Sequence, residues 1–295
     1  MIIHYLLIIL ANMIWGVSFI AMKWMLQSYS GLAAHSLRFI LAGLISIVLI
    51  TIGKRWKQSR KDLSMFALAG FFLFLTLWFQ TVGLKYTSVA KSGFITTLYA
   101  IFTPMISAIY YRRKFHPIYL AMVIVSLIGM VFLSGAELSG FNFGDFLSLM
   151  NAIFASFHIF YLGIVAKRIR NPLEFNFFQN AFIGGYCLIA LIVLEPRINL
   201  APVLAIESFG GANPLTGLFI LSVLSSLLAF SLQVYSQKKV PAHVASLLFM
   251  LESPFAALFA YFLLGEVMTG MQVIGAWLIT FSVVLGVWGE SRELK

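Results

Sequence analysis

Ten apolar segments, each long enough to cross a membrane as a helix, occupy most of this 295-residue chain. Crossing the hydrocarbon core of a bilayer takes about 20 residues of α-helix. Backbone N–H and C=O groups find no partners in lipid, so a spanning segment must satisfy them within a helix or a closed barrel. The segments therefore predict an all-α membrane protein with ten transmembrane helices. The expected helices cover residues 2–22, 31–52, 63–84, 89–111, 117–134, 144–165, 174–194, 214–235, 244–264 and 271–289.

The composition agrees with lipid as the main solvent. Hydrophobic residues make up 61% of the chain and charged residues 10%, whereas soluble domains are about 25% charged. The formal net charge is +10, but the basic residues lie between apolar segments, so we expect no nucleic-acid partner. The lone cysteine, Cys187, fits a small buried or lipid-facing hydrophobe. No charged stretch precedes the first segment, which indicates a retained helix and not a removed signal peptide.

The loops between the segments differ in their content of Lys and Arg, which collect on the cytoplasmic side of membrane proteins. When the loops are assigned alternately to the two sides, fifteen basic residues fall on one side and five on the other. This asymmetry predicts that both termini are cytoplasmic and that the protein is a multi-pass protein of the plasma (inner) membrane. The basic loops contain Lys54–Lys61, Arg112–Lys114, Lys167–Arg170 and Lys238–Lys239.

The second five segments repeat polar and special residues of the first five in the same order. Any single match has little weight, but four matches that keep their order indicate an internal repeat. The matches are Asn12, Trp15 and Gly16 with Asn151, Phe154 and Ala155 (shift 139), Arg38 and Gly43 with Gln179 and Gly184 (shift 141), Gln80 and Lys85 with Gln233 and Lys238 (shift 153), and Pro104 with Pro254 (shift 150).

Each copy contains an odd number of segments, so the second copy must cross the membrane in the opposite sense to the first. We expect repeats over residues 2–134 and 144–289, related by a pseudo-twofold axis in the membrane plane. Inverted repeats of this kind form a solute site near the midplane that opens alternately to each side. The pattern is typical of transporters of small solutes.

Several stretches in both halves resemble the EamA-type drug/metabolite transporters, and together they cover nearly the whole chain. In the first half they are Trp15–Phe19 with Lys23, Leu37–Ala42, and Thr87–Phe94 with Phe102–Pro104. In the second half they are Leu251–Ala257 and Leu264–Glu266.

The resemblance implies ten helices around a central cavity built mainly by helices 1–4 and 6–9. It implies peripheral helices 5 and 10, which serve in dimer contacts in that family, so a homodimer is one expectation. Family members move amino acids, related metabolites, nucleobase-like compounds or toxic amphiphiles, mostly outward. One departure is Phe154, which stands where the family commonly has Trp in helix 6. This departure predicts a less polar cavity wall on that side.

Polar groups inside a membrane are costly, and each is a functional candidate. Glu252 is either a coupling group for protons or cations or a structural carboxylate. Arg38 either binds a substrate carboxylate, snorkels outward or ties helix 2 to a helix end. Asn12 and Asn151 either line the substrate site or bridge helices. His158 is either a group that contacts substrate and couples protons or a neutral, hydrogen-bonded histidine.

Aromatic and proline residues supply the remaining candidates. Aromatic rings can stack on a substrate, although in a chain with 16% aromatic residues some must face lipid or pack internally. Pro104 and Pro254 each free a backbone carbonyl and are either hinges or static kinks. The aromatic substrate-binding candidates are Trp15, Phe19, Trp78, Tyr99, Tyr161 and Tyr235.

These observations predict a secondary transporter that exports small metabolites, such as amino acids or related neutral or amphiphilic solutes, by alternating access. No G-x-x-x-x-G-K-[ST] loop is present, so we expect a solute gradient or proton exchange as the drive. No metal-binding or hydrolase motif is present, so we expect no metal, no cofactor and no enzyme activity. The expected partners are a small-molecule substrate and membrane lipid. The alternatives are uptake or facilitated transport, and after those a channel or an intramembrane enzyme.

Overall fold

The computed structural model describes residues 1–54, 60–83, 85–112, 114–115, 117–135, 140–206 and 209–293. Within these ranges the chain forms helices and no strand, and ten helical spans are long and apolar enough to cross a membrane. The predicted all-α, ten-helix fold is therefore confirmed. Part of the predicted cytoplasmic loops, including Arg55, Lys57 and Arg113, lies outside the described residues.

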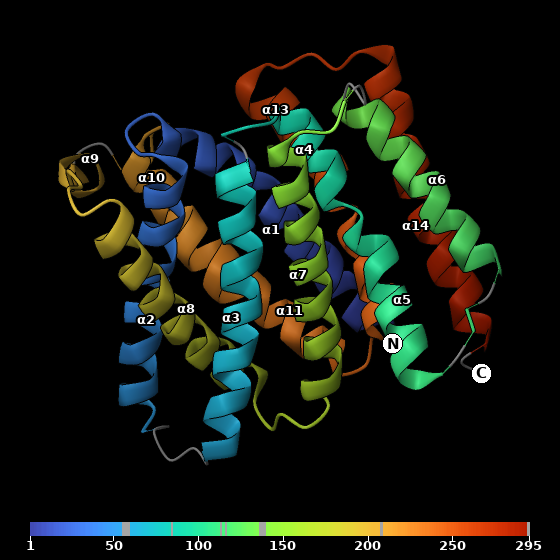
Figure 1. Cartoon of the computed structure of the whole chain (residues 1–295), viewed down its shortest axis with the longest axis horizontal. Helices are drawn as coiled ribbons and strands as arrows, with labels where there is room; N and C mark the ends of the chain where they lie inside the picture. The colour runs from blue at the N-terminus through green and yellow to red at the C-terminus, as the bar shows by residue number, and fades with distance from the viewer. Residues whose placement is uncertain are drawn as a thin grey trace.

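Seven of the ten spans are single helices, and the other three are interrupted. The fourth span consists of α4 and α5, the eighth of α10, η2 and α11, and the ninth of α12 and α13. A short helix, α9, lies in the loop before the eighth span (Figure 1). The bounds are α1 Ile2–Leu26, α2 Gly31–Ile52, α3 Arg60–Gly83, α4 Val89–Thr96, α5 Tyr99–Tyr111, α6 Pro117–Ser134, α7 Phe143–Val165, α8 Pro172–Leu194, α9 Ala201–Leu204, α10 Pro214–Phe219, η2 Ile220–Ala229, α11 Phe230–Gln237, α12 Ala242–Phe249, α13 Glu252–Leu264 and α14 Gly270–Glu293.

The sequence marks several helix starts with short polar side chains, which accept hydrogen bonds from the first free backbone N–H groups. Ser30 caps α2 by accepting from the N–H of Ala33. Asn142 and Asp145 form a reciprocal capping box at the start of α7. Asn213 caps α10, where proline follows at the first helical position. Local sequence chemistry therefore fixes where these spans begin.

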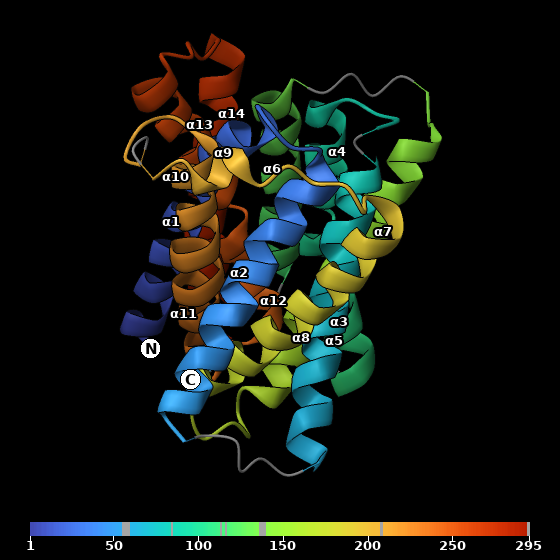
Figure 2. The same cartoon turned by 90° about the vertical axis from the view of Figure 1, so that its left-hand side faces the viewer.

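Helices α2 and α8 cross at a pair of glycines, and the contacts there are reciprocal. A Cβ atom on Gly43 would lie 3.0 Å from the carbonyl oxygen of Asn180, and one on Gly184 would lie 2.8 Å from that of Phe39. Phe39 and Asn180, like the two glycines, are 141 residues apart in the chain. Figure 2 shows α2 in front, with α10 and α11 on one side and α3 and α8 on the other.

The outer pair, α6 and α14, crosses in the same reciprocal way. A Cβ atom on Gly129 would lie 2.8 Å from the carbonyl oxygen of Gly275, and one on Gly275 would lie 2.5 Å from that of Gly129. Small residues let helix backbones approach closely in membranes. Two self-reciprocal crossings are what an inverted repeat requires, because the twofold axis must pass between equivalent helices.

The interrupted spans define the register of the repeat. α4 and α12 each have 8 residues, and α5 and α13 each have 13. Their starts and ends differ by 153 residues throughout, which makes Tyr99 equivalent to Glu252. The predicted match of Pro104 with Pro254, at a shift of 150, is wrong by three residues. Pro254 lies in the first turn of α13, where its missing N–H costs little, whereas Pro104 lies inside α5.

The two halves touch at one end of the molecule and separate at the other. We call the end that carries both chain termini the terminal end, and the other the distal end (Figure 1). At the terminal end α12 packs against α5 and α7. The equivalent distal pairs, α4 with α13 and α4 with α1, make marginal contact at most. Accordingly, every residue of α12 is buried and none of α13 is.

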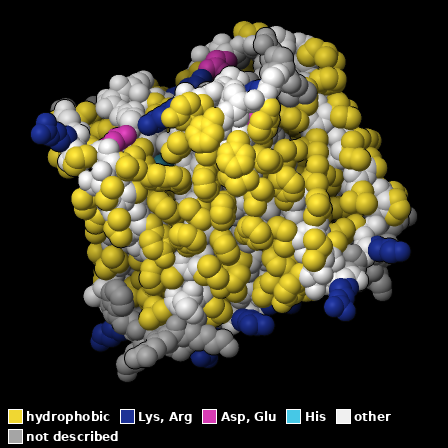
Figure 3. All heavy atoms as spheres, in the orientation of Figure 1, with side chains coloured by type: hydrophobic (Ala, Val, Ile, Leu, Met, Phe, Trp, Pro, Cys, Tyr) yellow, Lys and Arg dark blue, Asp and Glu magenta, His cyan; other side chains and the backbone are white. Residues whose placement is uncertain are grey.

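The outer surface has the polarity expected of a protein in a bilayer. Figure 3 shows hydrophobic side chains covering the middle of the face, with Lys and Arg along the edge at the terminal end. Exposed leucine, isoleucine and valine side chains such as Ile109, Ile189 and Val193 are more than 60% exposed, which lipid would cover. The molecule is an integral, multi-pass membrane protein.

Candidate functional site

The breaks in the fourth and ninth spans bring Tyr99 and Glu252 to the point where the halves separate. Glu252 is the first residue of α13 and is partly exposed. Its carboxylate makes no hydrogen bond or ion pair with any residue that the structure describes. Tyr99, the equivalent residue of the other half, is the first residue of α5. An unpaired carboxylate in such a place is available to a solute or a proton.

Arg38 is held on the neighbouring helix by two serines. Its Nε donates to Ser226 Oγ at 2.9 Å, and its Nη2 donates to Ser225 Oγ at 2.6 Å. The guanidinium carbon lies 4.8 Å above the ring centre of Phe39. Only 7% of Arg38 is exposed, so it does not snorkel to the surface. Arg38 ties α2 to the middle of η2, whereas the sequence-based alternative was a tie to a helix end.

The widened turns of η2 place the serines that hold Arg38. π-Helical turns are rare and often occur at functional sites. Besides Ser225 and Ser226, Ser222 of η2 donates to the carbonyl oxygen of Arg38 at 3.0 Å. No ion pair joins Glu252 to Arg38, so the carboxylate oxygens lie beyond 4.0 Å from the guanidinium nitrogens. Among the described residues, neither Arg38 nor Glu252 therefore forms an ion pair.

The two predicted asparagines both bridge helices. Asn12 Nδ2 donates to the carbonyl oxygen of Leu248 at 2.9 Å, and Asn151 Nδ2 donates to that of Thr76 at 2.6 Å. The Oδ1 atom of each asparagine is buried and has no hydrogen-bond partner among the described residues. Leu248 lies one helical turn before Glu252. The amide nitrogens therefore have structural partners, while the amide oxygens remain free acceptors.

Trp15 and His158 are packed inside the bundle. The ring of Trp15 contacts Phe230 and Phe249 at centroid distances of 5.2 and 5.5 Å, and its Nε1 is buried without a partner among the described residues. His158 Nε2 lies 3.2 Å from the side-chain oxygen of Gln179, and the histidine is 3% exposed. This is the hydrogen-bonded, buried histidine that was one of the two predictions for this position.

Three aromatic candidates are exposed or pack against other rings. Phe19 is 51% exposed and Tyr235 is 46% exposed, and Tyr235 stacks on His4 with ring centroids 5.2 Å apart. Tyr161 packs edge-on against Phe72 at 5.9 Å. The structure therefore does not place Phe19 and Tyr235 in the buried centre. Residue type could not reveal this, because aromatic side chains are common on both faces of these helices.

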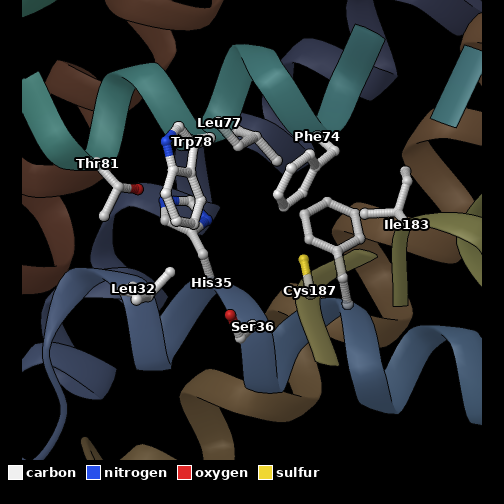
Figure 4. A pocket seen from close by; sticks show the side chains of 10 residues that line it. Leu32, His35, Ser36, Phe74, Leu77, Trp78, Thr81, Ile183 and Cys187 are labelled. Carbon is white, nitrogen blue, oxygen red and sulfur yellow. The ribbon is translucent and has the colours of Figure 1, made fainter. Parts of the chain in front are cut away.

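Trp78 lines a small pocket between α2, α3 and α8 (Figure 4). The pocket has a volume of about 20 Å³, which is room for about one water molecule. His35 Nδ1 and Thr81 Oγ1 are buried there without a partner among the described residues. Neither His35 nor Cys187 was expected at a pocket from the sequence alone. The lining residues are Leu32, His35, Ser36, Phe39, Phe74, Leu77, Trp78, Thr81, Ile183 and Cys187.

In the second half, the residues equivalent to those of this pocket are hydrogen-bonded to one another and to the backbone. The shifts of 141 and 153 residues carry His35 to Asn176 and Trp78 to Ser231. Asn176 Nδ2 donates to Ser231 Oγ at 2.9 Å and to the carbonyl oxygens of Ser226 and Leu227. The two halves therefore differ here in chemistry although their backbones correspond.

A buried ion pair joins α4 to α7 at the distal end, and sequence reasoning missed it. Lys91 Nζ lies 2.7 Å from Asp145 Oδ2 and donates to the carbonyl oxygen of Gly140 at 2.6 Å. Asp145 also accepts from Thr87 Oγ1 at 2.6 Å and is fully buried. The residue equivalent to Lys91 in the second half is Val244. The position of Lys91 inside an apolar segment could have indicated a buried partner of opposite charge.

Ten spans, an inverted repeat and a cluster of central polar groups define a multi-pass membrane protein with a membrane-embedded polar centre. The chain belongs to the EamA-like transporter family, whose model matches residues 2–135 and 142–288. The resemblance seen in the sequence is thereby confirmed. Members of this family are transporters and not enzymes.

Similar proteins support the same assignment. The chain is 32% identical over 278 residues to an uncharacterized transporter of Archaeoglobus fulgidus, covering 94% of this chain and 83% of that protein. A second uncharacterized transporter of Archaeoglobus fulgidus is 28% identical over 278 residues, covering 92% and 94%. A protein of known crystal structure with 18% sequence identity has the same fold, with a TM-score of 0.79 over 99% of each chain.

Proposed function

We propose that this transporter is a secondary carrier that exports amino acids or related neutral or amphiphilic solutes across the plasma membrane by alternating access. The observation that carries the proposal is the unequal contact between the halves, which are packed together at α12 and apart at α13. Inverted repeats that close at one end and part at the other are the basis of alternating access. With cytoplasmic termini, this arrangement is the outward-open state.

The breaks between α4 and α5 and between α12 and α13 are the hinges in this proposal. Pro104 and Pro254 lie just after these breaks and weaken the backbone hydrogen bonding there. Beside the second break, the side-chain amide of Asn12 donates a hydrogen bond to the carbonyl oxygen of Leu248. Bending at both places would let α4 close on α13 while α12 leaves α5.

Transport assays test the carrier directly. We would reconstitute the protein into liposomes and measure counterflow of labelled amino acids and nucleobases, with and without a pH gradient. Saturable counterflow supports a carrier. A response to the gradient supports proton coupling, with Glu252 as the first variant to examine and His158 as the second. Saturable flux that ignores the gradient supports a facilitator. Flux that never saturates would contradict the carrier and indicate a channel.

Labelling of single cysteines tests the outward-open state. In a Cys187→Ser background, Glu252→Cys lies at the start of the open α13, whereas Phe249→Cys lies in the buried α12 one turn earlier. We expect a membrane-impermeant thiol reagent to modify the first from the outside only and the second from neither side. Modification of the two variants at equal rates would refute the proposed state.

A further inference from the structure

An apolar groove with a volume of about 240 Å³ lies between α1, η2 and α13. All of its lining residues are aliphatic or aromatic and belong to membrane spans, so the groove lies at membrane depth. Water has no polar partner there, and an empty groove would forfeit van der Waals contacts. An apolar occupant therefore fits it. The lining includes Leu10, Met13 and Val17 of α1, Ile220 and Leu224 of η2, and Phe259 of α13.

The groove continues toward the terminal end along the seam between α1 and the eighth span. Leu224 is followed by Leu228 and Tyr235, both exposed, at spacings of four and seven residues that keep to about one face of the span. At the end of the seam, Tyr235 stacks on His4 of α1 with ring centroids 5.2 Å apart. Figure 2 shows α1 beside α10 and α11, with α13 above them.

Positive charge collects where this seam reaches the terminal end. Lys238 and Lys239 follow α11 directly, and Lys238 Nζ donates to the carbonyl oxygen of Arg170 at 3.5 Å, which brings the loop after α7 to the same corner. Among the described residues, no carboxylate pairs with Lys238, Lys239 or Arg170. Unpaired Lys and Arg at a membrane surface attract anionic lipid head groups.

We propose that the groove and the two lysines form one binding site for an anionic phospholipid of the leaflet at the terminal end. The phosphate binds at Lys238 and Lys239, and one acyl chain lies in the groove. Because Phe259 belongs to α13, the bound chain contacts the helix that is open at the distal end. The site does not depend on the carrier function proposed above.

The dimensions of the seam match those of a lipid. Met13 is nine residues after His4, which is about 14 Å along the helix at 1.5 Å per residue. Half the hydrocarbon core of a bilayer is about 15 Å thick. A head group at the level of His4 and the lysines therefore places the end of its acyl chain in the groove.

Charge and shape together select the occupant. A neutral lipid would fill the groove and leave the lysines without a counter-charge, whereas a free phosphate would pair the lysines and leave the groove empty. A molecule with both a negative head group and a long acyl chain satisfies both parts. A lipid is also present at high concentration around every membrane span, so the site is supplied without a separate entry path.

The test titrates the purified full chain in detergent with single lipids and follows binding by native mass spectrometry. The probes are phosphatidylglycerol and phosphatidylcholine with identical palmitoyl and oleoyl chains, dihexanoyl phosphatidylglycerol, and glycerol 3-phosphate. We expect one long-chain phosphatidylglycerol to bind about tenfold or more tightly than each of the other probes. Equal affinity for the two long-chain lipids overturns the proposal. Equally tight binding of glycerol 3-phosphate also overturns it, because that result shows a phosphate site without the groove.

Variants then separate the charged part from the apolar part. Lys238→Gln combined with Lys239→Gln should weaken phosphatidylglycerol about tenfold and leave phosphatidylcholine unchanged. The matched control, Lys85→Gln combined with Arg197→Gln, removes the same charge from exposed residues at the distal end and should have no effect.

The groove has its own variants. Leu224→Trp fills it and should weaken long-chain phosphatidylglycerol about tenfold, whereas Leu188→Trp adds the same bulk to an exposed residue of α8 and should not. Met13→Trp fills the groove from α1 and replaces Leu224→Trp if that variant does not fold. If the lysine double variant or the folded groove variant binds like its control, lipid covers this face without a defined site and the proposal fails.

Discussion

The crossing of α2 and α8 at Gly43 and Gly184 permits a prediction with a built-in control. The perturbation is Gly184→Ala, which places a Cβ atom 2.8 Å from the carbonyl oxygen of Phe39 and 3.4 Å from the Cα atom of Gly43. The next residue is also glycine, and a Cβ atom on Gly185 would meet nothing within 4 Å. The two substitutions add the same methyl group to adjacent residues of one helix, so only the tertiary contact differs between them.

The geometry gives the expected magnitude. To bring the Cβ–O distance at Gly184 from 2.8 Å to an ordinary 3.4 Å, the helices must part by about 0.6 Å at their crossing. Overpacking of this kind costs about 1–3 kcal/mol. Replacement of glycine by alanine in a helix recovers up to about 1 kcal/mol. We therefore expect Gly184→Ala to destabilise by about 1–2 kcal/mol and Gly185→Ala to be neutral or stabilising by up to about 1 kcal/mol.

The measurement is equilibrium unfolding in mixed micelles with an increasing fraction of SDS, followed by tryptophan fluorescence. Gly43→Ala provides a second check, because its Cβ atom would lie 3.0 Å from the carbonyl oxygen of Asn180. The double variant of Gly43 and Gly184 should cost less than the sum of the single variants, since one separation of the helices relieves both contacts. Equal unfolding free energies for Gly184→Ala and Gly185→Ala would refute the reasoning and the crossing itself.

The remaining predictions use the same titration. Asp145→Asn should lower the unfolding free energy by about 3 kcal/mol, because Lys91 then stays buried without a counter-charge. The double variant Lys91→Met with Asp145→Leu should recover part of this loss in unfolding free energy. No recovery would argue against the ion pair between Lys91 and Asp145. Asn12→Leu should cost about 1 kcal/mol through loss of the bond to Leu248, and an unchanged stability would show that this bond is not formed. Tyr235→Leu should change stability by less than about 0.5 kcal/mol and leave transport intact, so a large loss of transport would return Tyr235 to the site.

Much of the fold could be predicted because it follows from local patterns. The number and positions of the spans follow from hydropathy, since each span must by itself satisfy its backbone and present apolar side chains to lipid. Helix starts such as Asn142 with Asp145 follow from capping chemistry. The shift of 141 residues that relates Gly43 to Gly184 was visible in the sequence and proved to mark the crossing of the equivalent helices.

The site was less predictable because its contacts join residues far apart in the chain. Asn12 bonds to Leu248, which is 236 residues away, and Arg38 bonds to Ser226, which is 188 residues away. Residue type identifies such groups as costly but does not name their partners. Trp15 and Phe19 illustrate the limit, since both are aromatic and lie one turn apart, yet one is 8% and the other 51% exposed.

The sequence by itself therefore determined the membrane class, the ten spans, the repeat and the family, because these depend on composition, period and order along the chain. The tertiary structure alone decided the register of the broken spans, the ion pair between Lys91 and Asp145, and the end at which the halves part. The physical reason is that helices that correspond in the sequence pattern of the two halves can still make different tertiary contacts. Which of their ends meet depends on side chains from the other half, such as those that bury α12 and leave α13 open.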